Sequence, residues 1–291
     1  MSKIKQREKM KKILVTGGAG FVGSNLIKLL LEKGHKVTSL DNYDSGTMQN
    51  HHQGADYIPG DIELINTLDK DFDIIYHCAA LSRIQPSFNN PDETYRVNTL
   101  GTQKVCEFAR KNGIKVVYAG SSSKHHDPYQ SPYAACKYMG EEVCKMYKKT
   151  YGMDIEIARF YNVYGPGEIV YGDWAAVIGI WRRQAEAKEP ITIVGDGEQK
   201  RDFTHVEDIV EGLFRIGFKL EVHEDAWELG TGTNYSINDV YLMFKEKFGT
   251  DYKYIPDQNG NYRETLRENN DALLRLGWKP EDKLLSYINS L

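Results

Sequence analysis

Gly17-Gly18-Ala19-Gly20-Phe21-Val22-Gly23 is the stretch that decides the fold of this 291-residue chain. An apolar run at 12–16, typical of a buried strand, precedes it, and an amphipathic stretch at 21–33 follows it and predicts a helix. Gly17 permits a tight turn, Gly20 lets backbone N–H groups approach a phosphate, and Gly23 lets the helix pack closely on the strand. The stretch therefore predicts a nucleotide-binding strand–turn–helix unit.

The rest of the chain supports a sheet with crossover helices. Short β-rich runs alternate with amphipathic helical stretches, the pattern of a parallel sheet wrapped by helices. Further strands are expected at 36–40, 56–58, 73–77, 115–119, 155–160 and 227–229. Helices are expected at 97–112, 132–151, 175–187, 204–217, 237–248 and 271–276. We predict an α/β protein with a Rossmann-type doubly wound parallel sheet and a smaller C-terminal α/β substrate lobe.

The expected boundaries follow from this pattern. The nucleotide-binding domain is predicted at 11–165, with segments near 204–230 returning to it. The substrate lobe is predicted at 166–203 and 231–291, and residues 1–10 are expected to be an N-terminal extension.

Composition excludes several classes of function. A formal net charge of −4, with 27% charged and 41% hydrophobic residues, gives no reason to expect a nucleic-acid partner. No run reaches the length of a membrane span, and the charged first dozen residues do not resemble a signal peptide. The 4 cysteines lack metal-ligand spacing, which favours reduced thiols and a cytoplasmic location.

An acid follows the second predicted strand at the position where a dinucleotide site needs one. Asp41 lies 18 residues after Gly23, close to the usual distance for a carboxylate that binds the adenosine ribose hydroxyls. A carboxylate would repel a 2′-phosphate, and no Arg follows it, so NAD is favoured over NADP. The alternative interpretation is a glycine turn that serves only packing, with Asp41 capping a loop.

A second motif indicates proton transfer. Tyr133 and Lys137 are four residues apart, which places both on one face of a helix. An ammonium beside the phenol is expected to favour the ionised form and lower its pKa, so that Tyr133 acts as a base. Ser121, at the end of a predicted strand, would donate a hydrogen bond to the oxygen whose proton Tyr133 removes. The alternative is a solvated helix face.

Together these motifs resemble the extended short-chain dehydrogenase/reductase superfamily, and within it the NAD-dependent nucleotide-sugar epimerases and dehydratases. The motifs that carry the resemblance are the glycine stretch, Asp61-Ile62, His77-Cys78-Ala79-Ala80, Asn98, Ser121, Tyr133 with Lys137, residues 159–166 and residues 201–206. The resemblance implies cofactor contacts from Gly17, Gly20, Phe21, Val22, Gly23, Asp41, Asn42, Asp61, Ile62, Ala79, Ala80, Asn98, Tyr133 and Lys137.

The resemblance also implies a substrate site for a nucleotide sugar. Asn162 matches an amide that contacts the substrate diphosphate, and Arg201 matches an arginine that pairs with it. Ser82, Ser122 and Arg263 complete the expected substrate contacts. Gln258 stands where the family usually has a phosphate-binding Arg, and Arg263 is expected to compensate.

The residues after Ser121 select a branch of the family. The resembled dehydratases and UDP-glucuronate decarboxylases carry carboxylates there, whereas this chain has Ser122 and Ser123. Without these acids, elimination lacks its proton carriers. We therefore expect a UDP-hexose 4-epimerase that acts through a transient 4-keto intermediate. A nucleotide-sugar reductase or dehydratase of the same family, and a catalytically silent binding protein, remain alternatives.

The segment before Tyr133 is shorter than in the epimerases that the chain resembles. Only 12 positions separate Ser121 from Tyr133, and the segment contains Lys124-His125-His126-Asp127-Pro128. Two adjacent histidines do not point the same way from an extended chain, so a polar loop is favoured over a metal site. We predict no metal.

Assembly is inferred from the resemblance alone. Family members commonly pair through the helices expected here at 97–112 and 132–151, which implies a homodimer. An apolar stripe on the second helix would serve the protein's own core equally well.

Overall fold

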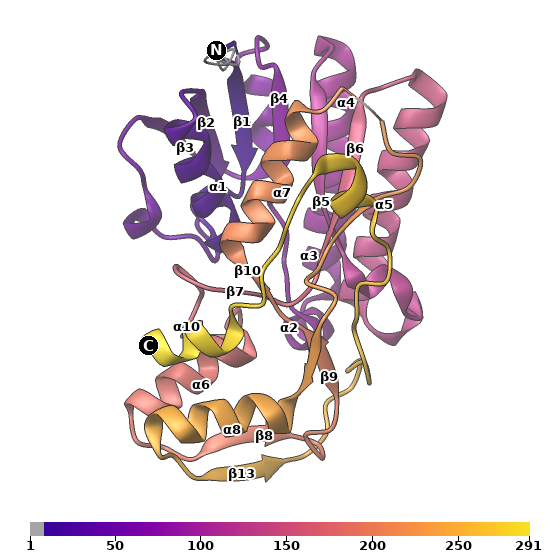
Figure 1. The fold of residues 1–291 in the computed structure, drawn as a ribbon. Helices are drawn as coiled ribbons and strands as arrows, with labels where there is room; N and C mark the ends of the chain where they lie inside the picture. The colour runs from indigo at the N-terminus through magenta and orange to yellow at the C-terminus, as the bar shows by residue number, and fades with distance from the viewer. Residues whose placement is uncertain (1–8, 221) are drawn as a thin grey trace.

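The computed structural model describes residues 9–220 and 222–291, and its centre is a seven-stranded parallel sheet (Figure 1). The strand order is β11-β6-β5-β4-β1-β2-β3. The strands are β1 (Lys12–Thr16), β2 (Lys36–Asp41), β3 (Ala55–Pro59), β4 (Ile74–His77), β5 (Lys115–Ser121), β6 (Ile155–Phe160) and β11 (Trp227–Leu229). Chain order reverses between β1 and β4, and in such sheets ligands bind outside the carboxyl ends of the strands at that point.

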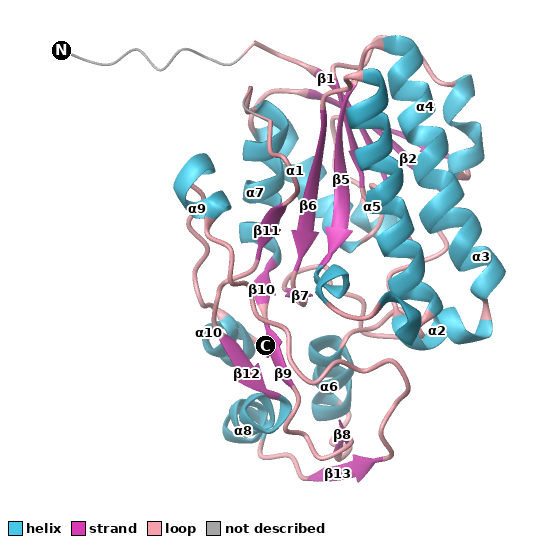
Figure 2. Ribbon diagram, turned by 90° about the vertical axis from the view of Figure 1, so that its right-hand side faces the viewer, coloured by secondary structure: helices cyan, strands magenta, loops and turns pink. Residues whose placement is uncertain are grey.

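Helices cover both faces of the sheet, as Figure 2 shows. One face carries α1 (Phe21–Glu32), α7 (Val206–Phe218) and α9 (Asp271–Leu276), whose apolar side chains form one core cluster with the sheet. The other face carries α4 (Thr102–Asn112) and α5 (Pro132–Tyr151), which share a second cluster with it. This arrangement confirms the predicted Rossmann-type α/β class.

Helix α5 begins at a well-defined cap, which fixes the position of Tyr133. The Ser131 side chain accepts a hydrogen bond from the Ala134 N–H at 3.1 Å, and Pro132 occupies the first turn. The Tyr133 N–H donates to Ser87 Oγ at 3.1 Å. Tyr133 is therefore held in the first turn of α5, beside the carboxyl end of β5.

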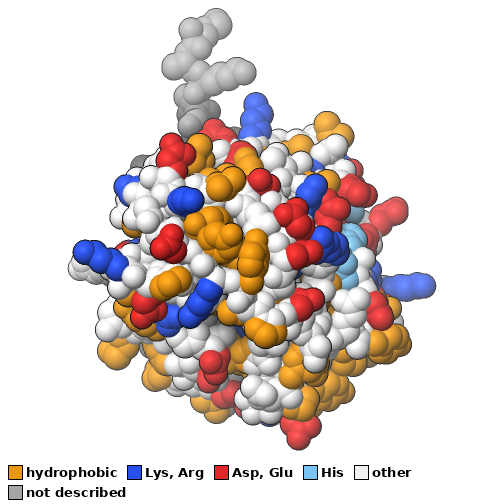
Figure 3. Space-filling model, turned by 90° about the horizontal axis from the view of Figure 1, so that it is seen from below, with side chains coloured by type: hydrophobic (Ala, Val, Ile, Leu, Met, Phe, Trp, Pro, Cys, Tyr) orange, Lys and Arg blue, Asp and Glu red, His pale blue; other side chains and the backbone are white. Residues whose placement is uncertain are grey.

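A smaller lobe lies below the sheet in Figure 1 and includes the C-terminus. Its elements are α6 (Val177–Glu186), β8 (Ile191–Val194), β9 (Lys200–Asp202), β12 (Asn234–Ser236), α8 (Ile237–Phe248), β13 (Tyr252–Ile255) and α10 (Leu284–Ser290). Trp181, Phe244 and Leu284 are among its fully buried core side chains. Seen from this lobe, the surface mixes apolar side chains with charges of both signs (Figure 3).

Several predicted elements differ from the structure. Residues 84–95 form two short helices, α2 (Ile84–Asn89) and α3 (Pro91–Tyr95), which the sequence analysis did not predict, and α10 was not predicted either. The expected helix at 97–112 begins as a π-helical turn, η3 (Arg96–Gly101), ahead of α4. Thr204 and His205 form strand β10 (Thr204–His205), which pairs with β7 (Val163–Tyr164), so the following helix starts at Val206. Short 3-10 helices are η1 (Met48–Asn50), η2 (Ile62–Thr67), η4 (Ser122–His125) and η5 (Pro128–Gln130).

The division into two lobes stays a proposal, with one adjustment. Residues 271–278 were assigned to the substrate lobe, but Ala272, Leu276 and Trp278 pack in the core of the sheet domain. The Trp278 indole N–H donates to the Asp208 carbonyl at 2.7 Å, which ties this segment to α7. Of the expected extension at 1–10, residues 1–8 lie outside the described residues. Within 9–220 and 222–291, no helix is long and apolar enough to cross a membrane.

Candidate functional site

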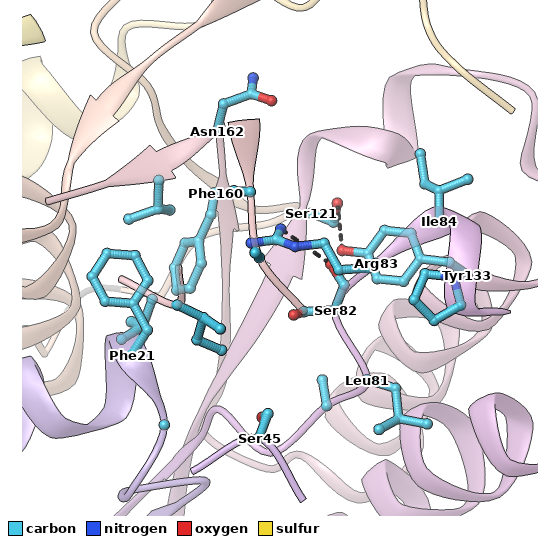
Figure 4. A pocket seen from close by; sticks show the side chains of 18 of the residues that line it. Phe21, Ser45, Leu81, Ser82, Arg83, Ile84, Ser121, Tyr133, Phe160 and Asn162 are labelled. Atoms are coloured by element: carbon cyan, nitrogen blue, oxygen red, sulfur yellow. Dashed lines mark hydrogen bonds between the residues drawn. The ribbon is translucent and has the colours of Figure 1, made fainter. Parts of the chain in front are cut away.

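A cavity of about 680 Å³ lies at the carboxyl edge of the sheet, where the chain order reverses. Its walls come from the glycine turn, the ends of β2, β4 and β5, the start of α5, and the smaller lobe. Figure 4 shows part of this lining. It includes most of the predicted site residues: Gly17, Gly20, Phe21, Val22, Gly23, Asp41, Asn42, Asp61, Ile62, Ala79, Ala80, Ser82, Ser121, Ser122, Tyr133, Lys137, Asn162 and Arg201. Asn98 and Arg263 do not line it.

Gly17, Gly18 and Gly23 in the glycine turn have no room for a side chain. Gly17 has a φ of +73°, and a Cβ there would lie 2.7 Å from the backbone nitrogen of Ala79. A Cβ on Gly23 would overlap the Gly17 carbonyl oxygen. The turn therefore presents bare backbone at the start of α1, where N–H groups and the helix dipole favour a phosphate.

Asp41 connects this turn to the end of β2. Its carboxylate is 7% exposed and accepts hydrogen bonds from the Ala19 N–H at 2.9 Å and the Tyr43 N–H at 2.8 Å. Asp41 thus caps the loop, as the alternative interpretation proposed, and also lines the cavity.

Asp61 forms an ion pair that the sequence analysis did not foresee. The Arg96 guanidinium donates to both carboxylate oxygens, at 2.9 and 2.8 Å, and lowers the pKa of Asp61. Asp61 also accepts from the Glu63 N–H at 3.0 Å and so caps η2. Arg96 and Asp61 are far apart in sequence, and no motif links them. The pair holds the Asp61 carboxylate at the cavity wall.

Asn98 lies behind the cavity wall and supports it through hydrogen bonds to the backbone of Leu81. The side chain is 1% exposed; its amide N–H donates to the Leu81 carbonyl at 2.9 Å, and its oxygen accepts from the Leu81 N–H at 2.8 Å. Asn98 itself does not line the cavity, and its contact with the cofactor stays a prediction. Its amide fixes the backbone of the segment that follows β4, and Ala79 and Ala80 of that segment line the cavity.

Ser121, Tyr133 and Lys137 meet at one end of the cavity. The Tyr133 hydroxyl donates to Ser121 Oγ at 3.4 Å, and Ser121 Oγ also accepts from the Ser123 N–H at 3.2 Å. Ser121 keeps its own O–H free to donate into the cavity. The Lys137 ammonium donates to the Ala119 carbonyl at 2.6 Å and lies 4.6 Å from the centre of the Tyr118 ring.

The protonation states differ from expectation. Burial lowers the pKa of Lys137 to about 8. Burial also raises the pKa of Tyr133, opposed in part by the Ser121 hydrogen bond and the positive charge of Arg83. The prediction that Lys137 lowers the Tyr133 pKa is therefore wrong for the unliganded site. The Lys137 ammonium is turned to the Ala119 carbonyl, and desolvation of the phenol dominates.

Arg83 and Glu168 also line the cavity, and the sequence analysis missed both. The Arg83 Nε–H donates to the Trp174 carbonyl at 2.9 Å. Burial raises the pKa of Glu168 to about 7, while the Tyr287 hydroxyl donates to its Oε1 at 2.8 Å. Both residues lie on loops without a recognisable motif, and only the fold brings them into the cavity.

At the substrate end of the cavity, the protein itself binds two of the predicted substrate ligands. The Asn162 Nδ2 group donates to the Asp202 carbonyl at 3.1 Å and to Thr265 Oγ1 at 2.9 Å, which uses both of its side-chain N–H donors. Asn162 lines the cavity, and its contact with a diphosphate stays a prediction. Arg263 is 67% exposed and pairs with Asp196 at 2.9 Å, so it does not compensate for Gln258.

Arg201 remains the charged donor at this end. It lines the cavity, and burial lowers the pKa of its guanidinium to about 10. Its Nη1 donates to the Lys200 carbonyl at 2.8 Å. Gln258, in the position where the resembled family has a cationic Arg, lines the same cavity as a neutral amide.

The adjacent histidines point to different partners. His125 is 2.9 Å from a Glu228 carboxylate oxygen, whereas the His126 ring stacks on Tyr262 with 4.0 Å between ring centres. In the described part of the chain, no three His, Cys, Asp or Glu side chains come together as metal ligands. These contacts instead attach the end of η4 to β11 on one side and to the cavity wall on the other.

A family model for the NAD dependent epimerase/dehydratase family matches residues 13–230. The chain belongs to this family. Its cofactor is accordingly NAD, and the bare glycine turn and Asp41 fit the pyrophosphate and adenosine ribose of that group.

Relatives and solved structures are similar over almost the whole chain. A putative UDP-glucose 4-epimerase of Methanocaldococcus jannaschii is 34% identical, covering 92% of this chain and 93% of the relative. Epimerase Mth375 of Methanothermobacter thermautotrophicus superposes with a TM-score of 0.90 at 31% identity, covering 97% of this chain and 91% of that one. The UDP-glucuronic acid 4-epimerase of Bacillus cereus, in complex with UDP-glucuronic acid and NAD, has a TM-score of 0.87 at 26% identity, with 95% and 96% coverage. Other relatives are named as UDP-glucuronic acid decarboxylases.

Proposed function

We propose that this protein is a nucleotide-sugar 4-epimerase that acts on a UDP-hexose through a transient 4-keto intermediate. The observation that carries the proposal is the hydrogen bond between Tyr133 and Ser121 in a cavity that Lys137 also lines, with hydroxyl side chains at the two positions after Ser121. Carboxylates at those positions would be the proton carriers for loss of water or carbon dioxide. Proton transfer at one oxygen is the chemistry that this set of side chains supports.

The side chains divide the work as follows. Tyr133, whose ionisation the hydrogen bond to Ser121 and the positive charge of Arg83 favour against the effect of burial, takes the proton of the C4 hydroxyl. The free O–H of Ser121 orients the same oxygen. Bound NAD supplies the acceptor and donor of the C4 hydride. Tyr133 returns the proton after the sugar ring has turned over, so that protons and electrons balance and no cofactor is consumed.

The nucleotide end is proposed to depend on Arg201. A guanidinium can bind a diphosphate through two parallel hydrogen bonds, and burial strengthens this pairing. Ser82 and Ser122, which also line the cavity, are proposed to contact the sugar. Arg263 is not part of the proposal because its guanidinium lies outside the cavity.

The test is turnover of nucleotide hexoses by purified protein with catalytic NAD. UDP-glucose, UDP-N-acetylglucosamine, UDP-glucuronate and their galacto forms are incubated separately, and products are separated by chromatography. Interconversion of at least one pair without net change in reduced nicotinamide is expected. Net oxidation of NADH would indicate a reductase, and neither product nor absorbance change with any of these sugars would indicate a binding protein.

We also propose a homodimer through the surface that η3 and α5 form. Leu100 is 42%, Tyr138 37% and Met146 44% exposed, an amount of exposed apolar surface that a partner would bury. Tyr147, by contrast, is 5% exposed and belongs to the protein's own core. Sedimentation equilibrium of the wild type and of a Met146→Glu variant tests this, with a shift toward monomer expected for the variant.

A further inference from the structure

Arg83 places a positive charge next to the reacting groups. It follows β4 and Ser82 and immediately precedes α2, and its side chain lines the cavity beside Tyr133 (Figure 4). The positive charge of Arg83 opposes in part the rise that burial causes in the pKa of Tyr133, and the two side chains lie in the same part of the cavity (Figure 4). The mechanism proposed above does not use this guanidinium.

The protein itself leaves much of this guanidinium unpaired. Nε–H donates to the Trp174 carbonyl at 2.9 Å, and Nη1 lies 3.4 Å from the Ser82 carbonyl. An Arg carries five N–H donors, so three remain for a ligand. Among the described residues, no carboxylate lies within ion-pair distance of Arg83. Because the guanidinium is half-buried, lines the cavity and has no carboxylate beside it, an anion is the expected partner.

Glu168, a carboxyl group in the same cavity, is not the counter-ion of Arg83. Glu168 lines the same cavity, but one of its oxygens is held by Tyr287 and the pKa of its carboxyl is raised to about 7 by burial. Near neutral pH a large fraction of Glu168 is therefore uncharged. Glu168 therefore compensates little of the positive charge of Arg83, and this charge is available to a ligand in the cavity.

Different segments of the chain hold the two guanidinium groups of the cavity. Arg201 belongs to β9 and donates to the Lys200 carbonyl, whereas Arg83 precedes α2 and contacts the Trp174 and Ser82 carbonyls. The reacting carbon of the sugar lies at the Tyr133 end, and Arg201 is the cation proposed to hold the diphosphate. A second anion on the sugar itself would match Arg83.

We propose that Arg83 binds a carboxylate on the sugar ring, so that the substrate is a nucleotide-linked uronate rather than a neutral hexose. This assignment rests on the proposed function, because it places the sugar at Ser121 and Tyr133. The planar guanidinium fork is suited to two parallel hydrogen bonds with a carboxylate. A site built for such a pair discriminates against a sugar that lacks the charged group, since the guanidinium would then stay unpaired.

The experiment compares UDP-glucuronate with UDP-glucose, which differ at C6. Wild type, Arg83→Gln, Arg83→Lys and the matched surface variant Arg110→Gln are assayed for kcat/KM with each sugar, and for affinity by calorimetry with each sugar and with UDP alone. Wild type is expected to prefer the uronate. Arg83→Gln is expected to lower the uronate-to-glucose ratio by roughly 30-fold or more, the lower end of the cost of truncating a desolvated charge pair. Arg83→Lys should lower the uronate-to-glucose ratio of kcat/KM less than Arg83→Gln does, and Arg110→Gln should leave this ratio unchanged.

The outcomes separate this inference from the proposed function. An unchanged ratio in Arg83→Gln, or an equal loss of affinity for UDP alone, would overturn it, because Arg83 would then serve the fold or the diphosphate. A fall in kcat for both sugars with a shifted pH profile would also overturn it and assign Arg83 to Tyr133. Uronate binding that depends on Arg83, together with a pentose product or with no product, would retain the inference and refute 4-epimerisation.

Discussion

Replacing Lys137 with Met is expected to stabilise the unliganded protein at pH 7 while abolishing turnover. The ammonium is 5% exposed, and burial lowers its pKa from 10.5 to about 8. At 1.36 kcal/mol per pH unit, keeping this group charged in the folded protein costs about 3 kcal/mol near neutral pH. The variant also loses the hydrogen bond to Ala119 and the contact with the Tyr118 ring, each worth about 1 kcal/mol. A net gain of about 1 kcal/mol follows.

The difference in the free energy of unfolding between wild type and Lys137→Met is expected to change with pH. Between about pH 8 and pH 10.5 the folded protein has released the Lys137 proton while the unfolded chain still holds it. Where the unfolded state binds more protons, stability rises with pH. Wild type therefore gains stability across this window relative to Lys137→Met, and the advantage of the variant present at pH 7 is lost as the pH approaches 10.

Urea unfolding without NAD, followed by tryptophan fluorescence at pH 7 and pH 9.5, measures both effects. Lys149→Met, on the exposed side of the same helix, is the matched control and should change the free energy of unfolding by less than about 0.5 kcal/mol at either pH. A Lys137→Met variant less stable than wild type at pH 7, or a difference that does not change with pH, would refute the reasoning.

Three further predictions concern the cofactor turn, the base and a buried charge cluster. Tyr133→Phe should lower kcat by about 10²-fold or more by removing the proton carrier, with NAD affinity changed less than about threefold by calorimetry; retained turnover would exclude Tyr133 as the base. Gly23→Ala should weaken NAD binding at least about tenfold, because its Cβ overlaps the Gly17 carbonyl, whereas Gly152→Ala, with no atom within 4 Å of the new Cβ, should leave NAD affinity unchanged. Arg159→Met should lower the free energy of unfolding by about 3 kcal/mol, because Arg159 is 3% exposed and its loss leaves the buried carboxylate of Glu228 without its guanidinium; a change below about 1 kcal/mol in urea unfolding would contradict this.

The local patterns were the most reliable guides to the fold. The glycine stretch can be interpreted from the strand before it and the helix after it. Ser131-Pro132 sets the start of α5 through contacts within four residues. Elements were missed where tertiary contacts override the pattern. Thr204 and His205 read as the start of a helix but pair with β7, and residues 271–278 follow the substrate lobe in sequence but pack on the sheet.

What the sequence determined by itself is the class of fold and the cofactor, because the glycine turn and its flanking strand and helix follow one another directly along the chain. The spacing of four places Tyr133 and Lys137 on the same helix, but the tertiary structure directs the Lys137 ammonium to the Ala119 carbonyl. Only the tertiary structure decided which charges reach the cavity. Arg83 and Glu168 enter it from loops, whereas Arg263 turns away to Asp196 and both N–H groups of Asn162 are taken by the protein itself. Which charged side chains face the substrate depends on how the two lobes pack together. The spacing of residues along the sequence does not show this packing.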